Sequence, residues 1–124
     1  MKLTNKQITD SVKAMGKILN QDLSIKTQFK LNKNIDKLNG IIIAFEKSKK
    51  SLIDKYADRD EKGELLITDN MYTFKKHNKE FNKEFNELLT IKNDIFIEKI
   101  SVNELEEIKL NNAEFNAIKF LIKE

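Results

Sequence analysis

The chain has 124 residues, of which 40% are hydrophobic and 35% are charged, and its formal net charge is +3. It contains no cysteine, no proline and a single histidine, which excludes disulfides, thiol catalysis and a triad or multi-histidine zinc site built within one chain. No apolar run approaches the roughly 18 residues of a membrane span, and residues 1–7 lack the apolar region of a secretory signal. We therefore expect one domain, residues 1–124, in the cytoplasm and without a membrane partner.

The basic residues are concentrated in the first half of the chain. Residues 1–57 contain 12 lysines and 5 acidic residues, whereas residues 58–124 contain 11 basic and 15 acidic residues. The first half is therefore net positive and the second half net negative, which favours the docking of either half on a surface of opposite charge.

The first element that the sequence predicts is an N-terminal helix within residues 1–22. Thr4 is a suitable N-cap, Gln7 follows three residues later, and Leu3 and Ile8 flank them, as in a capping box with a hydrophobic staple. Apolar residues then recur at steps of four and three, which places them on one face of the helix.

A long helix is predicted over residues 23–57, with Ser24 as its N-cap. Its apolar residues follow the spacing of one continuous helix face: Leu31, Ile35, Leu38, Ile42, Phe45, Leu52 and Tyr56. Lys49 interrupts this apolar seam. Because an ammonium group is costly to bury, we expect the far end of the seam to lie near solvent.

Residues 58–74 predict a polar turn and a small β-hairpin around Thr68-Asp69-Asn70. Counted from Asp58, the same stretch has acidic residues at the first, third and twelfth positions of an EF-hand loop. Lys62, however, stands where an oxygen ligand is needed. A solvated acidic turn is therefore favoured over a calcium site, and no metal ligand is assigned.

Residues 75–91 predict a third helix, whose tandem Asn-Lys-Glu-Phe repeat places Phe81 and Phe85 on the face that suits the long helix. Residues 94–124 predict a strand at 95–102, followed by short helices that open with capping boxes at Ser101 and Asn111. The predicted fold is mostly α (α+β). A long helix is packed by two or three further helices, with a small antiparallel β-hairpin or three-stranded element.

A lysine stripe is the main candidate interaction surface. Its members share helical spacing on outer helix faces: Lys26, Lys30, Lys33 and Lys37 on the long helix, and Lys13 and Lys17 on the first helix. Such a surface suits a phosphate backbone or an acidic protein face, and in a lysine-rich chain it is also typical of a solvated helix. Arg59 is the only arginine, and no aromatic residue interleaves the stripe, so nucleic-acid binding is the less favoured use.

The sequence offers no catalytic constellation. It lacks a nucleophile elbow, a glycine-rich phosphate loop and a metal-ligand cluster. We therefore expect no enzymatic activity and no cofactor.

Three stretches of the chain carry a family resemblance: residues 55–64, residues 81–89, and residues 95–105 with Phe120-Leu121-Ile122 at the close. Their order within residues 23–124 resembles the DUF1617-like family of small phage and prophage proteins of uncharacterised function. The resemblance implies a phage origin and a location in the host cytoplasm. It transfers no catalytic residue.

Two classes of function remain. The favoured one is a non-catalytic, phage-encoded binding protein that occludes a host protein or ribonucleoprotein, such as an anti-CRISPR-like inhibitor of a bacterial defence system. The alternative is a structural or assembly accessory protein of the virion that acts as a homo-oligomer. A weaker third hypothesis is a non-specific nucleic-acid-binding protein.

Overall fold

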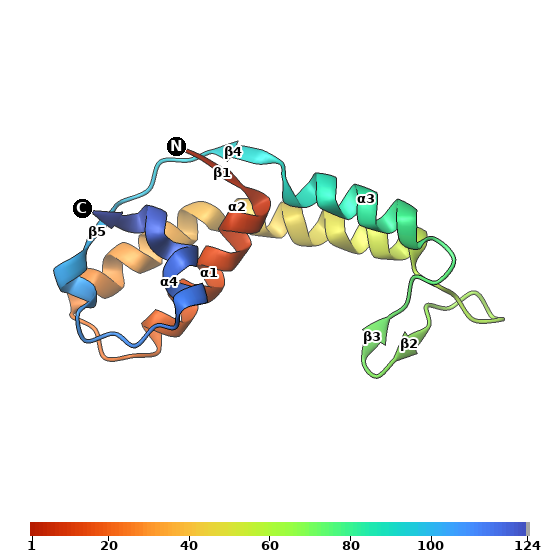
Figure 1. The fold of residues 1–124 in the computed structure, drawn as a ribbon, viewed down its shortest axis with the longest axis horizontal. Helices are drawn as coiled ribbons and strands as arrows, with labels where there is room; N and C mark the ends of the chain where they lie inside the picture. Colours follow the sequence, from red (N-terminus) through yellow and green to blue (C-terminus); the bar gives the residue numbers. More distant parts are fainter. Residues whose placement is uncertain (124) are drawn as a thin grey trace. The chain divides into compact units, whose positions relative to one another are not determined.

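The computed structural model describes residues 1–123, and their contacts group into two compact units. Unit 1 combines Met1–Ile42 with the chain from Lys92 onward, and unit 2 is the continuous segment Ile43–Ile91. The long helix α2, Ile25–Tyr56, contributes its first part to unit 1 and its second part to unit 2 (Figure 1). The length of the chain predicts one domain, but the contacts separate because α2 has different partners along its length.

The fold is mostly helical with short strand pairs, which confirms the predicted fold class. Within the described residues the helices are α1 Asn5–Leu19, α2, α3 Asn78–Leu89 and α4 Asn112–Ile118, with 3-10 turns η1 Val102–Leu105 and η2 Lys119–Leu121. The strands are β1 Lys2–Thr4, β2 Ile67–Thr68, β3 Met71–Tyr72, β4 Lys92–Asp94, β5 Ile100–Ser101 and β6 Ile122–Lys123.

Unit 1 is built around the predicted capping box of α1. The Thr4 hydroxyl accepts the Gln7 N–H at 3.1 Å, and the Gln7 side-chain oxygen accepts the Thr4 N–H at 2.8 Å. The core behind this helix start draws on both ends of the chain and the first part of α2. Its buried members include Leu3, Ile8, Met15, Ile18, Leu31, Leu38, Ile95, Ile97, Ile100, Ile118 and Leu121.

The strands form separate two-stranded pairs instead of one larger sheet. β1 pairs with β4 and β2 with β3, both antiparallel, whereas β5 pairs with β6 in parallel. The predicted strand at 95–102 is therefore wrong for most of its length, because only Ile100 and Ser101 join a ladder, and it adds no third strand to the hairpin. The segment before them still alternates as a strand does, with Ile95 and Ile97 buried and Phe96 exposed.

Unit 2 pairs α3 with the second part of α2 through aromatic side chains, as the phenylalanine spacing predicts. The Phe45 ring, 6% exposed, lies 6.3 Å from the Phe85 ring centroid. Phe81 stacks on Phe85 at 5.5 Å and on Phe74 at 3.9 Å, so the rings form a continuous row. Within this row, the Phe45–Phe85 contact joins α2 to α3.

Two local contacts set the boundaries of the other unit 2 elements. The predicted third helix starts at residue 75, but α3 begins at Asn78. The reason is that the Asp58 carboxylate accepts the N–H groups of Lys75 and Lys76, at 2.8 Å and 3.2 Å. The predicted hairpin is confirmed as β2 and β3, and its turn residues Asp69 and Asn70 have φ values of 52° and 63°. These left-handed values are those of the tight turn that best matches strand twist.

Candidate functional site

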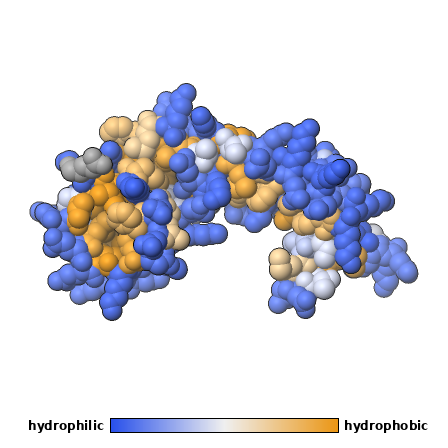
Figure 2. All heavy atoms as spheres, viewed as in Figure 1, coloured by the Kyte–Doolittle hydropathy of each residue, from blue (hydrophilic) through white to orange (hydrophobic). Residues whose placement is uncertain are grey.

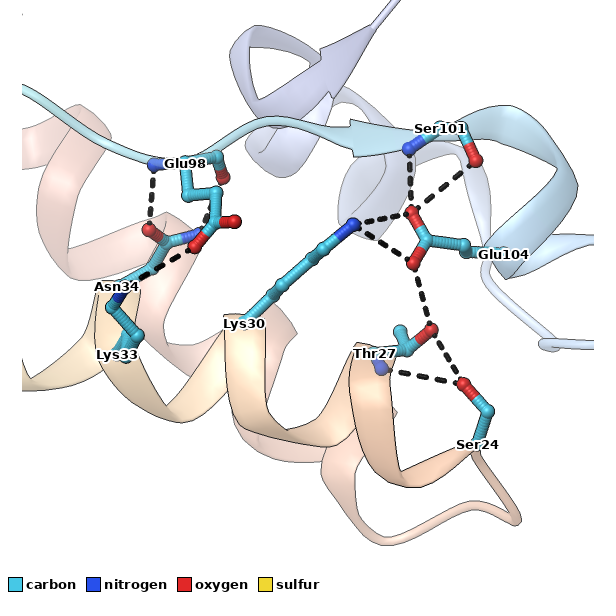
Figure 3. Close-up of polar contacts among 8 residues, drawn as sticks. All are labelled: Ser24, Thr27, Lys30, Lys33, Asn34, Glu98, Ser101 and Glu104. Atoms are coloured by element: carbon cyan, nitrogen blue, oxygen red, sulfur yellow. Dashed lines mark hydrogen bonds and ion pairs between the residues drawn. The ribbon is translucent and has the colours of Figure 1, made fainter.

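The predicted lysine stripe on α2 is partly neutralised by acidic residues from later in the chain. The Lys30 ammonium lies 3.1 Å from one Glu104 oxygen, and the Thr27 hydroxyl donates to the same carboxylate at 3.2 Å (Figure 3). The carboxylate also accepts the Ser101 N–H at 2.9 Å, as the predicted capping box requires. The Ser101 hydrogen bond, with the Lys30 ammonium beside it, lowers the pKa of Glu104 below its ordinary value. Lys30 therefore links α2 to η1 through an ion pair.

A second set of polar contacts joins α2 to residue 98. Lys33 forms an ion pair with the Glu98 carboxylate at 3.5 Å. One residue further along the helix, the Asn34 side chain is buried and bonds to both backbone groups of Glu98 (Figure 3). The chain on either side of Glu98 is thus fixed against α2, and its exposed side chains have a defined place beside the stripe.

Those exposed side chains extend the stripe into a broader surface, which we call the basic face. It consists of the lysines that line two hollows of about 480 Å³ and 500 Å³ in unit 1: Lys2, Lys30, Lys33, Lys37, Lys99, Lys119 and Lys123. The hollows share Lys99 and Lys123, so they form one continuous surface. Among residues 1–123, Glu98 is the only acidic residue that lines either hollow.

The basic face has an aromatic residue among its lysines, and this corrects the prediction that no aromatic residue interleaves the stripe. Phe96 lines the first hollow and is 84% exposed, and the Lys37 ammonium lies 5.3 Å from its ring centroid. Along α2, the Lys33 ammonium lies 5.6 Å from the ring centroid of Phe29, which is 62% exposed. Each pair has the geometry of a cation–π contact at an exposed site.

The other predicted lysines lie elsewhere in unit 1. Lys13 and Lys17 line a hollow of about 510 Å³ between α1 and α4, where Lys17 pairs with Glu114 at 3.0 Å. The Asn111 N–H and the Lys17 ammonium lower the pKa of Glu114. In the view of Figure 2, apolar residues gather on the near side of unit 1 within a hydrophilic border. Lys26 is exposed on α2 and lines neither hollow of the basic face.

The acidic stretch from Asp58 does not converge in the manner of a calcium loop. The Asp58 carboxylate accepts the Lys75 N–H and the Thr73 hydroxyl, each at 2.8 Å, and these bonds lower its pKa. The Asp60 carboxylate accepts the N–H groups of Lys62 and Glu64 instead. Among residues 1–123, no group of three His, Cys, Asp or Glu side chains gathers in a way that could hold a metal ion.

Comparison of the sequence with models of known protein families finds no match, and none is found among curated proteins or solved structures. The resemblance to the DUF1617-like family stays a prediction. No helix in the described part of the chain combines the length and the apolar character that crossing a membrane requires. The basic face is therefore the feature of the molecule that points to a function.

Proposed function

We propose that this chain is a non-catalytic binding protein that covers an anionic macromolecule with its basic face, in the manner of an occluding inhibitor. The observation that carries the proposal is the charge of the two joined hollows, whose described lining contains seven lysines and one glutamate. Hollows lined by charge of one sign focus the electrostatic field and attract ligands of the opposite sign.

The local ion pairs leave most of this charge available. Lys30 and Lys33 have carboxylate partners in Glu104 and Glu98. The other five lysines of the basic face make no ion pair with any described residue: Lys2, Lys37, Lys99, Lys119 and Lys123. Among the described residues, these five ammonium groups are not neutralised by a carboxylate, so their charge can attract an anionic partner.

Occlusion also fits the chemistry of the chain, because blocking a partner requires a surface and no reacting group. We propose a host macromolecule as the partner, and interference with that partner's own contacts as the mode of action. The competing role in virion assembly predicts a large homo-oligomer, whereas an occluding protein acts as a monomer or dimer. Native mass spectrometry of the purified chain distinguishes these two outcomes.

Retention on immobilised heparin, a generic polyanion, tests the role of the basic face. The test variant is Lys99→Glu with Lys123→Glu, which reverses the two lysines that both hollows share. The matched control is Lys50→Glu with Lys83→Glu, which makes the same change in net charge on exposed residues of unit 2. We expect the control to elute at nearly the salt concentration of the wild type and the test variant to elute much earlier. Elution of the two variants at the same salt concentration would contradict the proposal.

A further inference from the structure

We infer that the anionic partner of the basic face is single-stranded nucleic acid, and that Phe96 is the platform on which one unpaired base stacks. This inference rests on the proposed function and names the class of ligand. The structural reason is that an aromatic ring and free phosphate-binding cations occur together on one surface, which is the combination that sequence-independent single-strand binding uses.

The exposure of Phe96 is enforced by its neighbours. Ile95 is 9% exposed and Ile97 is 7% exposed, whereas Phe96 between them is 84% exposed. Because successive side chains of an extended segment point to opposite sides, burial of the two isoleucines directs the phenylalanine outward. The Asn34 bonds to the backbone of Glu98 hold the segment in that orientation. A ring that is this exposed gains apolar burial when a base covers it.

The positions of the neighbouring cations suit the phosphates of a strand whose base lies on that ring. Lys37 lies over the Phe96 ring, and Lys33 is one helical turn before it on α2. Phe29, one further turn before, is a second exposed ring beside a lysine. Two exposed rings, each with a lysine ammonium nearby, therefore occur along α2 and across to residue 96. Two such pairs could contact different nucleotides of one strand.

The same features favour a single strand over a duplex or an acidic protein. In a duplex the bases stack on one another and present no face to Phe96, and an acidic polypeptide has carboxylates but no base to stack. The ammonium group of lysine lacks the planar, two-pronged geometry with which the arginine guanidinium recognises guanine. The only arginine, Arg59, belongs to unit 2 and is not part of the basic face. Binding is therefore expected to depend little on base sequence, with DNA and RNA strands as two separate arms of the test.

Fluorescence anisotropy with labelled oligo(dT) and oligo(U) of about 20 nucleotides tests the inference at low salt. We expect Phe96→Ala to weaken binding about 5- to 150-fold, whereas Phe96→Trp retains affinity because it keeps an aromatic face. Phe115→Ala is the matched control, since Phe115 is an exposed phenylalanine of α4 outside both hollows. The logarithm of the association constant is expected to fall with the logarithm of salt concentration with a slope of about −3.5, from about 0.7 for each phosphate neutralised by one of the five lysines without an ion pair. Far-UV circular dichroism checks that each variant is folded.

The outcomes separate the inference from the proposed function. Binding of duplex and single strand with equal affinity, unchanged by Phe96→Ala, would overturn the inference and leave the polyanion proposal standing. The wild type could instead bind polyglutamate but neither oligonucleotide, and lose that binding in the Lys99→Glu and Lys123→Glu double variant. This result would overturn the inference, leave the polyanion proposal standing and identify an acidic protein as the partner. If the wild type binds no polyanion at low salt, both proposals fail.

Discussion

Asn34 and Glu98 are joined by a reciprocal pair of hydrogen bonds: the Asn34 amide donates to the Glu98 carbonyl oxygen at 2.8 Å, and its carbonyl oxygen accepts the Glu98 N–H at 2.9 Å. A carboxamide carries one donor and one acceptor on the same plane, as a peptide group does. The Asn34 side chain therefore takes the place that a neighbouring strand would occupy. It satisfies the backbone of the segment that carries Phe96 while leaving that segment outside any sheet.

This relationship predicts a large stability effect at Asn34. Replacing it with alanine leaves both backbone groups of Glu98 without their partner, and we expect the free energy of unfolding to fall by about 2–4 kcal/mol. Urea denaturation followed by circular dichroism measures the change. Asn32→Ala, on the exposed side of α2, is expected to alter stability by less than about 0.5 kcal/mol. If the two variants were equally stable, the hydrogen bonds would not be holding residue 98.

Glu104 predicts part of the acid sensitivity of unit 1. Its pKa is lowered mainly by the Ser101 N–H and further by the Lys30 ammonium, so folding favours the charged form. A group whose pKa is lower in the folded state contributes stability above its ordinary pKa, and this contribution is lost as the pH falls through the folded value. We expect the Tm of the wild type to drop more steeply below about pH 4.5 than that of Glu104→Gln. The control is Glu106→Gln on the exposed side of the same segment, which should follow the wild type, and a parallel course for all three proteins would contradict the assignment.

The burial of Phe45 predicts that its removal will destabilise unit 2, and tyrosine fluorescence can measure this loss. The chain has two tyrosines and no tryptophan, and Tyr56 and Tyr72 both belong to unit 2. Phe45→Ala removes a buried ring from the aromatic row, and we expect a loss of about 3–5 kcal/mol in the unfolding monitored by tyrosine emission. Phe29→Ala truncates an exposed ring on the same helix and should leave that transition in place. Equal shifts for the two variants would argue against a core at Phe45.

The β2–β3 turn predicts a residue-specific response at Asn70, where φ is 63°. Asn70→Val places a β-branched side chain in the left-handed region, and we expect it to destabilise the hairpin by about 1–2 kcal/mol. Asn70→Gly should be tolerated or mildly stabilising, because glycine adopts this backbone conformation freely. Amide hydrogen exchange at β2 and β3 is the measurement. Faster exchange in the glycine variant than in the valine variant would show that another conformation is present.

The parts of the fold that could be predicted are those encoded by neighbours in the sequence. The capping boxes at Thr4, Ser101 and Asn111 each join residues three apart, and all three occur in the structure. The pairing of strands could not be predicted in the same way. Leu3 pairs with Asn93, and nothing local to either residue indicates the other as its partner.

The candidate site was predictable only in part, for the same reason. Helical spacing identified Lys33 and Lys37, since both lie on one face of a single helix. Lys99 and Lys123 join them through the tertiary fold, which no period in the sequence encodes. Phe96 carried a usable signal, because it alternates with Ile95 and Ile97 and so falls on the opposite side. The sequence prediction used Phe96 only as evidence for a strand at 95–102 and did not consider which side it would face.

The division into two units has a consequence for the order in which the chain folds during synthesis. Unit 2 is one uninterrupted segment, Ile43–Ile91, whereas unit 1 joins Met1–Ile42 to residues beyond Lys92. Contacts between distant parts of a chain form late because their loop must first close. A ribosome-bound chain that has not yet emerged past residue 92 can complete unit 2 but lacks five of the twelve described buried residues of the unit 1 core, including Ile97, Ile100 and Leu121. The basic face therefore forms only after unit 2 has been synthesised, because Lys99, Lys119 and Lys123 all follow residue 92 in the chain.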